Sequence, residues 1–155
     1  MQWEETKVGE VGEAGFTEEE VHQQALSNGA GWPLVFLAYA RDRGQSAGAA
    51  ARDFGRLAAP SWDEVRGAGA LVTARLAALN AVTTGAKLLR LTGDEARAEA
   101  VLSGWPDPEA LEFFRLTQAE ADAFHGHMGP IAEYLGLRFA YRRDGDEVVL
   151  TVESA

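Results

Sequence analysis

Apolar residues recur at helical spacing over most of this chain, and start and stop signals divide the pattern into separate helices. The longest run extends from Trp62 to Leu91, where apolar side chains return every three or four residues and predict one continuous helix. Helices are also expected before it, from Glu18 to about Ser27, from Pro33 through the apolar run 34–40, and from about Ala47 to Leu57. Pro33 suits the first turn of a helix, so the second of these helices is expected to begin there.

The region after the long helix is predicted to contain three more helices, near Asp94 to Leu102, near Pro108 to Leu116 and from Gln118 onward. Pro130 lies inside the last of them and cannot donate the helical hydrogen bond, so regular helix is expected to break between Gly126 and Pro130. Four Ser or Thr residues are followed by Glu three positions later, a spacing that caps helix starts. These pairs are Thr17 and Glu20, Ser61 and Glu64, Thr92 and Glu95, and Thr117 and Glu120.

Near the C-terminal end the period changes from helical to the alternation of a strand. Residues 137–141 and 148–152 carry large apolar side chains at every second position, and Asp144 and Gly145 lie between these runs. Asp-Gly between two alternating runs is a strong hairpin signal, so a β-hairpin is predicted over 137–152. The expected fold class is therefore α+β and predominantly helical, a helical bundle with a C-terminal β-hairpin packed on it.

Length and composition indicate one domain. The chain has 155 residues, of which 46% are hydrophobic, and a chain of this size can bury one substantial core. We expect residues 16–155 to form a single helical domain that includes the hairpin at 137–152. Acidic side chains crowd the first twenty positions, so residues 1–15 are expected to form a flexible acidic N-terminal arm.

The charge balance excludes several classes of partner. The chain has 24 acidic and 14 basic side chains and a net charge of −10, which argues against binding to nucleic acid and to an anionic membrane surface. No run approaches about 18 apolar residues and no signal peptide is recognisable, so a soluble, cytoplasmic protein is expected. The chain has no cysteine, which removes disulfides and thiolate metal sites, and no pattern in it identifies a cofactor.

Arg75 is the residue that most suggests a site, because it falls on the apolar face of the predicted long helix. A guanidinium out of water is costly unless a carboxylate or carbonyl groups meet it, so we expect Arg75 to be largely buried and bonded to an acid. Three interpretations stay open: pairing with an internal acid such as Asp42, Asp53 or Glu133, extension along a groove to solvent, and anchoring of a ligand carboxylate or phosphate.

His125 and His127 flank Gly126 and are the clearest candidates for acid–base chemistry, since imidazole is the commonest general base and a frequent metal ligand. Side chains two positions apart on a regular helix point in different directions, so these two can share a metal only if the helix is unwound at Gly126. A third ligand such as His22 or Asp122 would then be needed. Otherwise no metal is expected, and both histidines are either catalytic or purely structural.

Tryptophans lie beside predicted helix starts, and Gly-Trp-Pro occurs twice, at 31–33 and 104–106. Trp32 and Trp62 either fix how the chain enters a helix or line a pocket together with Tyr39. The predicted long helix also carries an arc of small residues that would let another helix approach closely, so a homodimer formed through this helix or the hairpin edge is expected. The arc consists of Gly67, Ala70, Ala74, Ala77, Ala81 and Gly85.

Two resemblances rest on these features. An early helix leading to Gly31-Trp32-Pro33, a helical middle, Phe124-His125 and a hairpin after Leu135-Gly136 together resemble the L-2-amino-thiazoline-4-carboxylate hydrolase-like families. The stretch from Phe124 to Pro130 is similar to the His-Gly-His segment in the family of E-type subunits of formylmethanofuran dehydrogenase, with Gly129 where that family usually has cysteine. The first resemblance implies hydrolysis of a small cyclic amide-like substrate, and the second implies metal binding at the histidines.

The function expected from the sequence is binding of a small, anionic organic ligand in a binding or regulatory role, with Arg75 as the anchor. The wall residues would be Trp32, Tyr39, Trp62 and His125. One alternative is a hydrolase of a cyclic amide-like substrate with His125 or His127 as general base. The other is a structural dimerisation module, which would show a large exposed apolar patch in place of a pocket.

Overall fold

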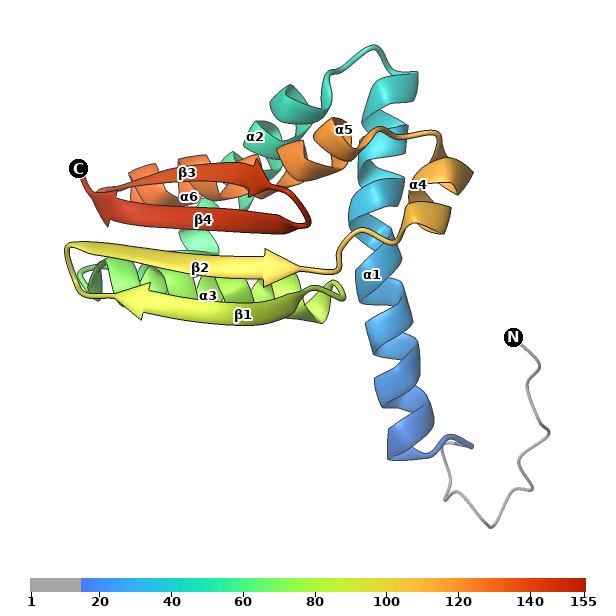
Figure 1. Cartoon of the computed structure of the whole chain (residues 1–155), viewed down its shortest axis with the longest axis horizontal. Helices are drawn as coiled ribbons and strands as arrows, with labels where there is room; N and C mark the ends of the chain where they lie inside the picture. Colours follow the sequence, from blue (N-terminus) through green and yellow to red (C-terminus); the bar gives the residue numbers. More distant parts are fainter. Residues whose placement is uncertain (1–14) are drawn as a thin grey trace.

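The computed structural model describes residues 15–155 and places them in a four-stranded antiparallel sheet with helices packed on it (Figure 1). Apart from residue 15, the predicted N-terminal arm lies outside the described residues. Within residues 15–155, no helix combines the length and the hydropathy of a membrane-spanning segment. In chain order the elements are α1 (Glu18–Asp42), α2 (Ala47–Ala58), the 3-10 helix η1 (Ala59–Val65), α3 (Gly69–Thr83), β1 (Lys87–Gly93), β2 (Arg97–Ser103), α4 (Pro108–Phe114), α5 (Gln118–Ala123), the 3-10 helix η2 (Phe124–His127), α6 (Met128–Tyr134), β3 (Leu137–Asp144) and β4 (Glu147–Ser154).

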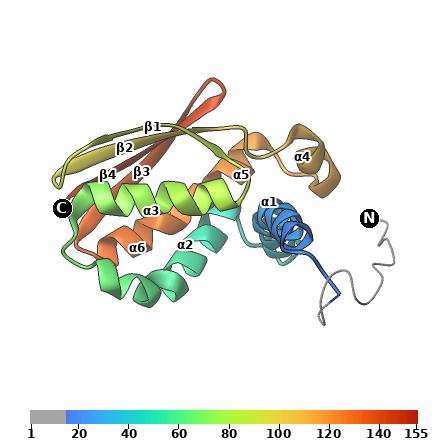
Figure 2. The same cartoon turned by 90° about the horizontal axis from the view of Figure 1, so that it is seen from below.

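The sheet has the strand order β1-β2-β4-β3, and Figure 2 shows it as one layer with the helices beneath it. In the central strands every second side chain turns toward the helices, as Ala100 of β2 and Leu150 of β4 do where they face each other. α3 packs on β1, β2 and β4, and α6 packs on β3. The fold is therefore α+β and mostly helical with a C-terminal β-hairpin, β3–β4, as the sequence predicts.

The predicted long helix is wrong at both ends, because glycines with positive φ interrupt it. Gly67 (φ 81°) and Gly69 (φ 87°) turn the chain before α3, and Gly85 (φ 101°) turns it afterwards. Residues with a side chain rarely adopt such angles, so these positions favour a change of direction. The chain up to Val65 forms η1, and the leucines after Lys87 enter strand β1 instead of a helix.

The predicted helix near residues 94–102 is also wrong, since this segment forms a hairpin turn and strand β2. The Asp94 carboxylate accepts hydrogen bonds from the backbone N–H groups of Ala96 (2.8 Å) and Arg97 (3.1 Å), which closes the turn. Thr92 and Glu95 therefore form no helix cap. In β2 alternate side chains are buried from Ala98 onward, which is the period-2 pattern of a strand.

α1 runs without interruption, although the sequence predicts an end near Ser27 and a new start at Pro33. Gly29 does not end the helix: it lies against the end of α3, where a Cβ on it would come within 3.3 Å of the carbonyl carbon of Thr83. Pro33 removes one helical hydrogen bond, and the helix continues because Pro33, Leu34 and Leu37 are buried in the core.

The predicted helix break falls at η2, just before Pro130. Pro130 is the third residue of α6, where the backbone N–H has no partner within the helix, so a proline is tolerated there. Two of the four predicted caps are confirmed, Thr17 with Glu20 and Thr117 with Glu120. Ser61 instead donates to the carbonyl of Ala58 within η1.

Candidate functional site

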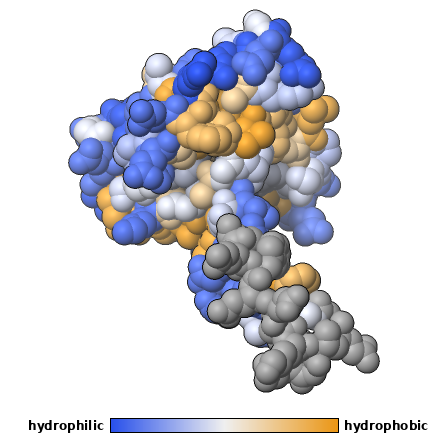
Figure 3. All heavy atoms as spheres, turned by 90° about the vertical axis from the view of Figure 1, so that its right-hand side faces the viewer, coloured by the Kyte–Doolittle hydropathy of each residue, from blue (hydrophilic) through white to orange (hydrophobic). Residues whose placement is uncertain are grey.

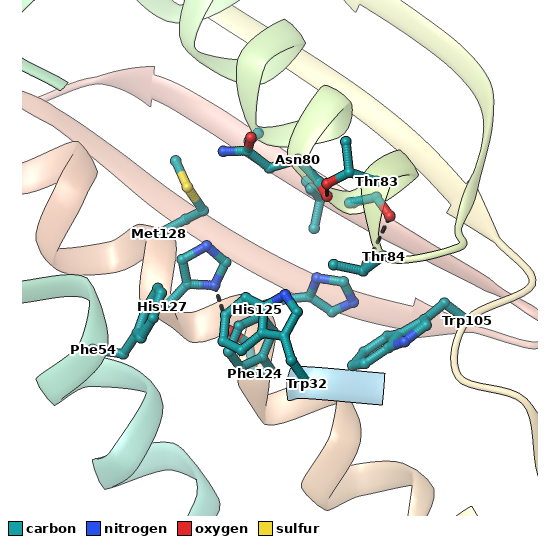
Figure 4. A pocket seen from close by; sticks show the side chains of 13 residues that line it. Trp32, Phe54, Asn80, Thr83, Thr84, Trp105, Phe124, His125, His127 and Met128 are labelled. Atoms are coloured by element: carbon teal, nitrogen blue, oxygen red, sulfur yellow. Dashed lines mark hydrogen bonds between the residues drawn. The ribbon is translucent and has the colours of Figure 1, made fainter. Parts of the chain in front are cut away.

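A cavity of about 160 Å³ lies where α1, α2, the C-terminal end of α3 and η2 come together (Figure 4). Its walls are largely aromatic, and the rings touch one another: Trp32 lies 5.4 Å from Phe54 and meets Phe124 edge-on at 5.3 Å, between ring centroids. Trp105, from the segment between β2 and α4, forms another wall, and its indole N–H donates to the carbonyl of Ala30 (3.2 Å). The polar side chains that line the cavity are Asn80, Thr83, Thr84, His125 and His127.

The 3-10 geometry of η2 brings both histidines to this cavity. A 3-10 helix has three residues per turn, so side chains at positions i and i+3 lie above one another. The rings of Phe124 and His127 accordingly lie 4.7 Å apart at an angle of 32°. Figure 4 shows the rings of His125 and His127 among the side chains that line the cavity.

The hydrogen bond of His127 fixes its tautomer. Its Nδ1 lies 2.6 Å from the carbonyl oxygen of Phe124, and because a carbonyl can only accept, Nδ1 carries the proton. Burial lowers the pKa of His127, and the bond to Phe124 opposes this shift only in part. The neutral ring therefore keeps an unprotonated Nε2, which can accept a hydrogen bond or act as a general base.

His125 is a second neutral imidazole. Its side chain is only 7% exposed, and its ring meets Trp105 edge-on with centroids 5.8 Å apart. Burial lowers the pKa of His125 to about 4, although the negative charge of Asp122 acts in the opposite direction. His125 forms no hydrogen bond with residues 15–155, and no sealed side-chain nitrogen of the described chain lacks a partner. Its ring nitrogens are therefore in contact with open space.

The described residues that line the cavity include no charged side chain at neutral pH. The hydroxyl groups of Thr83 and Thr84 donate to the carbonyls of Asn80 (2.6 Å) and Ala81 (2.7 Å), which leaves their oxygens as acceptors. The remaining wall is carbon and the thioether of Met128. The cavity therefore suits a neutral molecule, since an anion placed there would lose water without gaining a cation.

The prediction that Arg75 is buried is wrong. Its side chain is exposed on α3 and forms no hydrogen bond or ion pair within the described part of the chain. α3 packs on the sheet through small residues such as Ala70 and Ala74, and it turns larger ones such as Leu79 (49% exposed) outward. Arg75 lies on that outward face, away from the cavity.

The acids proposed as partners of Arg75 do not contact it. Asp42 pairs with Arg41 and Asp53 with Arg56, while Glu133 is exposed. The same packing of α3 buries most of the small-residue arc against the chain's own sheet, so this arc is not a dimer surface.

The other predicted wall residues divide between the cavity and the surface. Trp32 and His125 line the cavity, as does His127. Tyr39 is 55% exposed and lies beneath the guanidinium of Arg43, 3.5 Å from ring centroid to carbon. Trp62, in η1, is half-buried and packs on the core elsewhere.

Sequence reasoning missed the remaining walls. Phe54 lies on α2, and Asn80, Thr83 and Thr84 lie at the end of α3, where no periodic signal marks them. The repeated Gly-Trp-Pro was a usable signal, because Trp32 and Trp105, the tryptophans of its two copies, line the same cavity.

The buried ion pair of this protein involves Asp122, not Arg75. Asp122 on α5 is 6% exposed and receives two hydrogen bonds from Arg143 on β3, from Nε (2.6 Å) and Nη2 (2.8 Å). Gln118 donates a third (2.9 Å). This pair holds the hairpin β3–β4 against α5, directly beside the histidine segment η2.

The described residues contain no group of three or more His, Asp or Glu side chains that could hold a metal ion. His22 is exposed on α1 and Asp122 is occupied by Arg143, so neither completes a shell with His125 and His127. The two histidines are therefore better described as polar groups of an organic binding site.

Comparison of the chain with models of known protein families and with curated protein sequences found no match. The two family resemblances noted above therefore stay predictions, and function has to be argued from the cavity itself.

Proposed function

We propose that this protein binds a small, neutral organic molecule in the cavity between Trp32, Trp105 and the two histidines. The observation that carries the proposal is the combination of aromatic walls with two imidazoles that burial keeps neutral. Binding sites for small molecules are typically apolar clefts with a few polar groups that orient the ligand. The anionic ligand expected from Arg75 is replaced by a neutral one, because no cation reaches the cavity from the described residues.

The volume limits the ligand to about one ring. A core cavity of about 150 Å³ is large enough to hold benzene, and this cavity measures about 160 Å³. Nε2 of His127 offers an acceptor, and Asn80 offers both a donor and an acceptor. A single ring that carries one hydroxyl or N–H group, such as a phenol, an azole or a lactam, matches this arrangement.

Phenol is expected to bind with a dissociation constant of about 1 mM or tighter, and benzoate at least about tenfold more weakly, since its charge would be desolvated without a partner. Ligand-observed NMR with both probes, together with tryptophan fluorescence, measures this. Ala81→Leu should abolish phenol binding because Ala81 lines the cavity, whereas its neighbour Val82, 37% exposed on the outer face of α3, provides the control Val82→Leu. Equal binding to both variants, or none to the parent, would contradict the proposal.

A second candidate, hydrolysis of a small cyclic amide-like substrate, is favoured by the fixed tautomer of His127. With Nδ1 held by Phe124, Nε2 can take a proton from water as the water oxygen attacks the substrate carbonyl. The ring C–N bond then breaks, and the leaving nitrogen receives that proton.

With succinimide as the probe, His127→Gln is expected to lower kcat by about 100-fold or more, and His22→Gln, at an exposed position, should leave it unchanged. Because burial lowers the pKa of His127, kcat should stay constant as the pH falls through about 6.5, where an ordinary histidine becomes protonated. A parent protein that hydrolyses the probe no faster than the His127→Gln variant would rule this candidate out.

A further inference from the structure

The outward face of α1 carries a row of exposed side chains, here named the α1 stripe: Val21, Ala25, Asn28, Trp32, Val35 and Tyr39. They follow one another at steps of four, three, four, three and four residues, which is the 3.5-residue period of a helix that pairs with another helix. The apolar members are well exposed, with Val21 at 58%, Val35 at 52% and Tyr39 at 55%.

The N-terminal half of α1 also lacks a support within the described chain. Figure 1 shows this half extending away from the rest of the fold, and apart from Gln24 its residues from Glu18 to Asn28 are exposed. A helical segment of this length is marginal in water on its own. Figure 3, which shows the side where α1 and α4 lie, displays apolar surface bordered by hydrophilic surface. Exposed apolar surface of this kind is typical of an interaction site.

We propose that the α1 stripe binds the same stripe of a second copy of this chain, with the two helices antiparallel about a two-fold axis near residue 30. A two-fold interface needs a surface that complements itself. In this register Val21 lies opposite the partner's Tyr39, Ala25 opposite the partner's Val35, and Asn28 opposite the partner's Trp32. Each layer pairs a smaller with a larger side chain, so the three layers can pack at similar helix separation.

The charges at the two ends of the stripe select a second copy in antiparallel orientation. Glu18 lies on the same face as the stripe at its N-terminal end, and Arg43 at its C-terminal end, one turn beyond Tyr39. Neither forms an ion pair with another residue of the described chain. The antiparallel register brings Glu18 close to the partner's Arg43 at both ends, whereas parallel helices would place like charges together.

The first test is sedimentation equilibrium of the full chain over a micromolar concentration series. A dimer of twice 16.6 kDa is expected. Val35→Glu should raise its dissociation constant by about 100-fold or more, because the substitution acts twice in a symmetric interface. Leu57→Glu is the matched control, since Leu57 is 81% exposed on α2 and outside the stripe. A monomer at all concentrations would overturn the proposal, including the case in which residues 1–14 cover the stripe.

The second test distinguishes the orientation. Glu18→Arg and Arg43→Glu should each weaken the dimer by about tenfold, and the double variant should restore it, because only an antiparallel pair exchanges the two charges. The chain has no cysteine, so an oxidised mixture of Ala25→Cys and Val35→Cys proteins should give a mixed disulfide dimer. Preferential cross-linking of Ala25→Cys protein to itself, or a dimer that Val35→Glu does not weaken, would overturn the proposal.

Discussion

Gly55→Ala is expected to lower the free energy of unfolding by about 3 kcal/mol, even though alanine favours helix formation by up to about 1 kcal/mol. Gly55 lies in α2 where this helix crosses η2. A Cβ on it would stand 2.8 Å from the carbonyl carbon and 3.1 Å from the Cα of His127, closer than side chains approach a backbone. The backbone of η2 cannot give way easily, because the hydrogen bond from His127 to Phe124 and the packing of Phe124 hold it.

Gly48→Ala is the matched control in the same helix. A Cβ at Gly48 meets nothing within 4 Å, so this substitution is expected to raise stability by up to about 1 kcal/mol. Urea unfolding followed by circular dichroism compares the two variants with the parent protein. α1 offers a second pair, because Gly29 touches the backbone of Thr83 while Gly31 faces open space. Equal unfolding midpoints for Gly55→Ala and Gly48→Ala would show that α2 does not pack on η2 as described.

Local signals in the sequence predicted the parts of the fold that depend on local structure. The Asp-Gly turn and the alternation around it indicated the hairpin β3–β4, and α2 and α4 were expected close to their observed bounds. The first sheet pair was missed because its residues, such as Ala98 and Ala100, are equally compatible with a helix. They become a strand only when paired with β1 and β4, and a single sequence does not reveal those partners.

The interpretation of α3 failed for a different reason. Its sequence presents two apolar faces, one of alanines and one of larger residues, and periodicity alone does not say which of them packs. The structure buries the alanines, because small side chains let the helix lie close to the sheet. Arg75 is consequently on the solvent side, and a buried arginine was inferred where none exists.

The candidate site was partly recognisable in the sequence. The histidine segment and Trp32 were identified because their residue types are informative in any context. The 3-10 geometry that turns both histidines to one cavity depends on tertiary packing: η2 is pressed against Gly55 of α2 and followed by Pro130 in α6. The threonines at the end of α3 became wall residues only through the approach of α1 at Gly29.

Lowering the pH from 7 to 5 is expected to reduce the free energy of unfolding by about 2 kcal/mol through His125 alone, since one pKa unit corresponds to about 1.4 kcal/mol. In the folded protein burial lowers the pKa of His125 to about 4, against 6.5 for the ordinary side chain. Between these two values the unfolded chain binds a proton that the folded chain does not, so stability falls as the pH falls. The loss begins near pH 6.5 and is complete below about pH 4.

Urea unfolding at pH 7 and at pH 5 measures this difference, and His125→Gln removes the titrating group. The variant should lose most of the pH dependence over this range, whatever its stability at pH 7. His22→Gln, at an exposed position, should keep all of it. Burial lowers the pKa of His127 as well, so a remaining slope in the His125→Gln variant should disappear with His127→Gln. The charges of Asp122 and Arg143 shift the pKa of His125 in opposite directions, and burial outweighs both. A His125→Gln variant with the full pH dependence of the parent would show that His125 is solvated and that the cavity wall is not closed on that side.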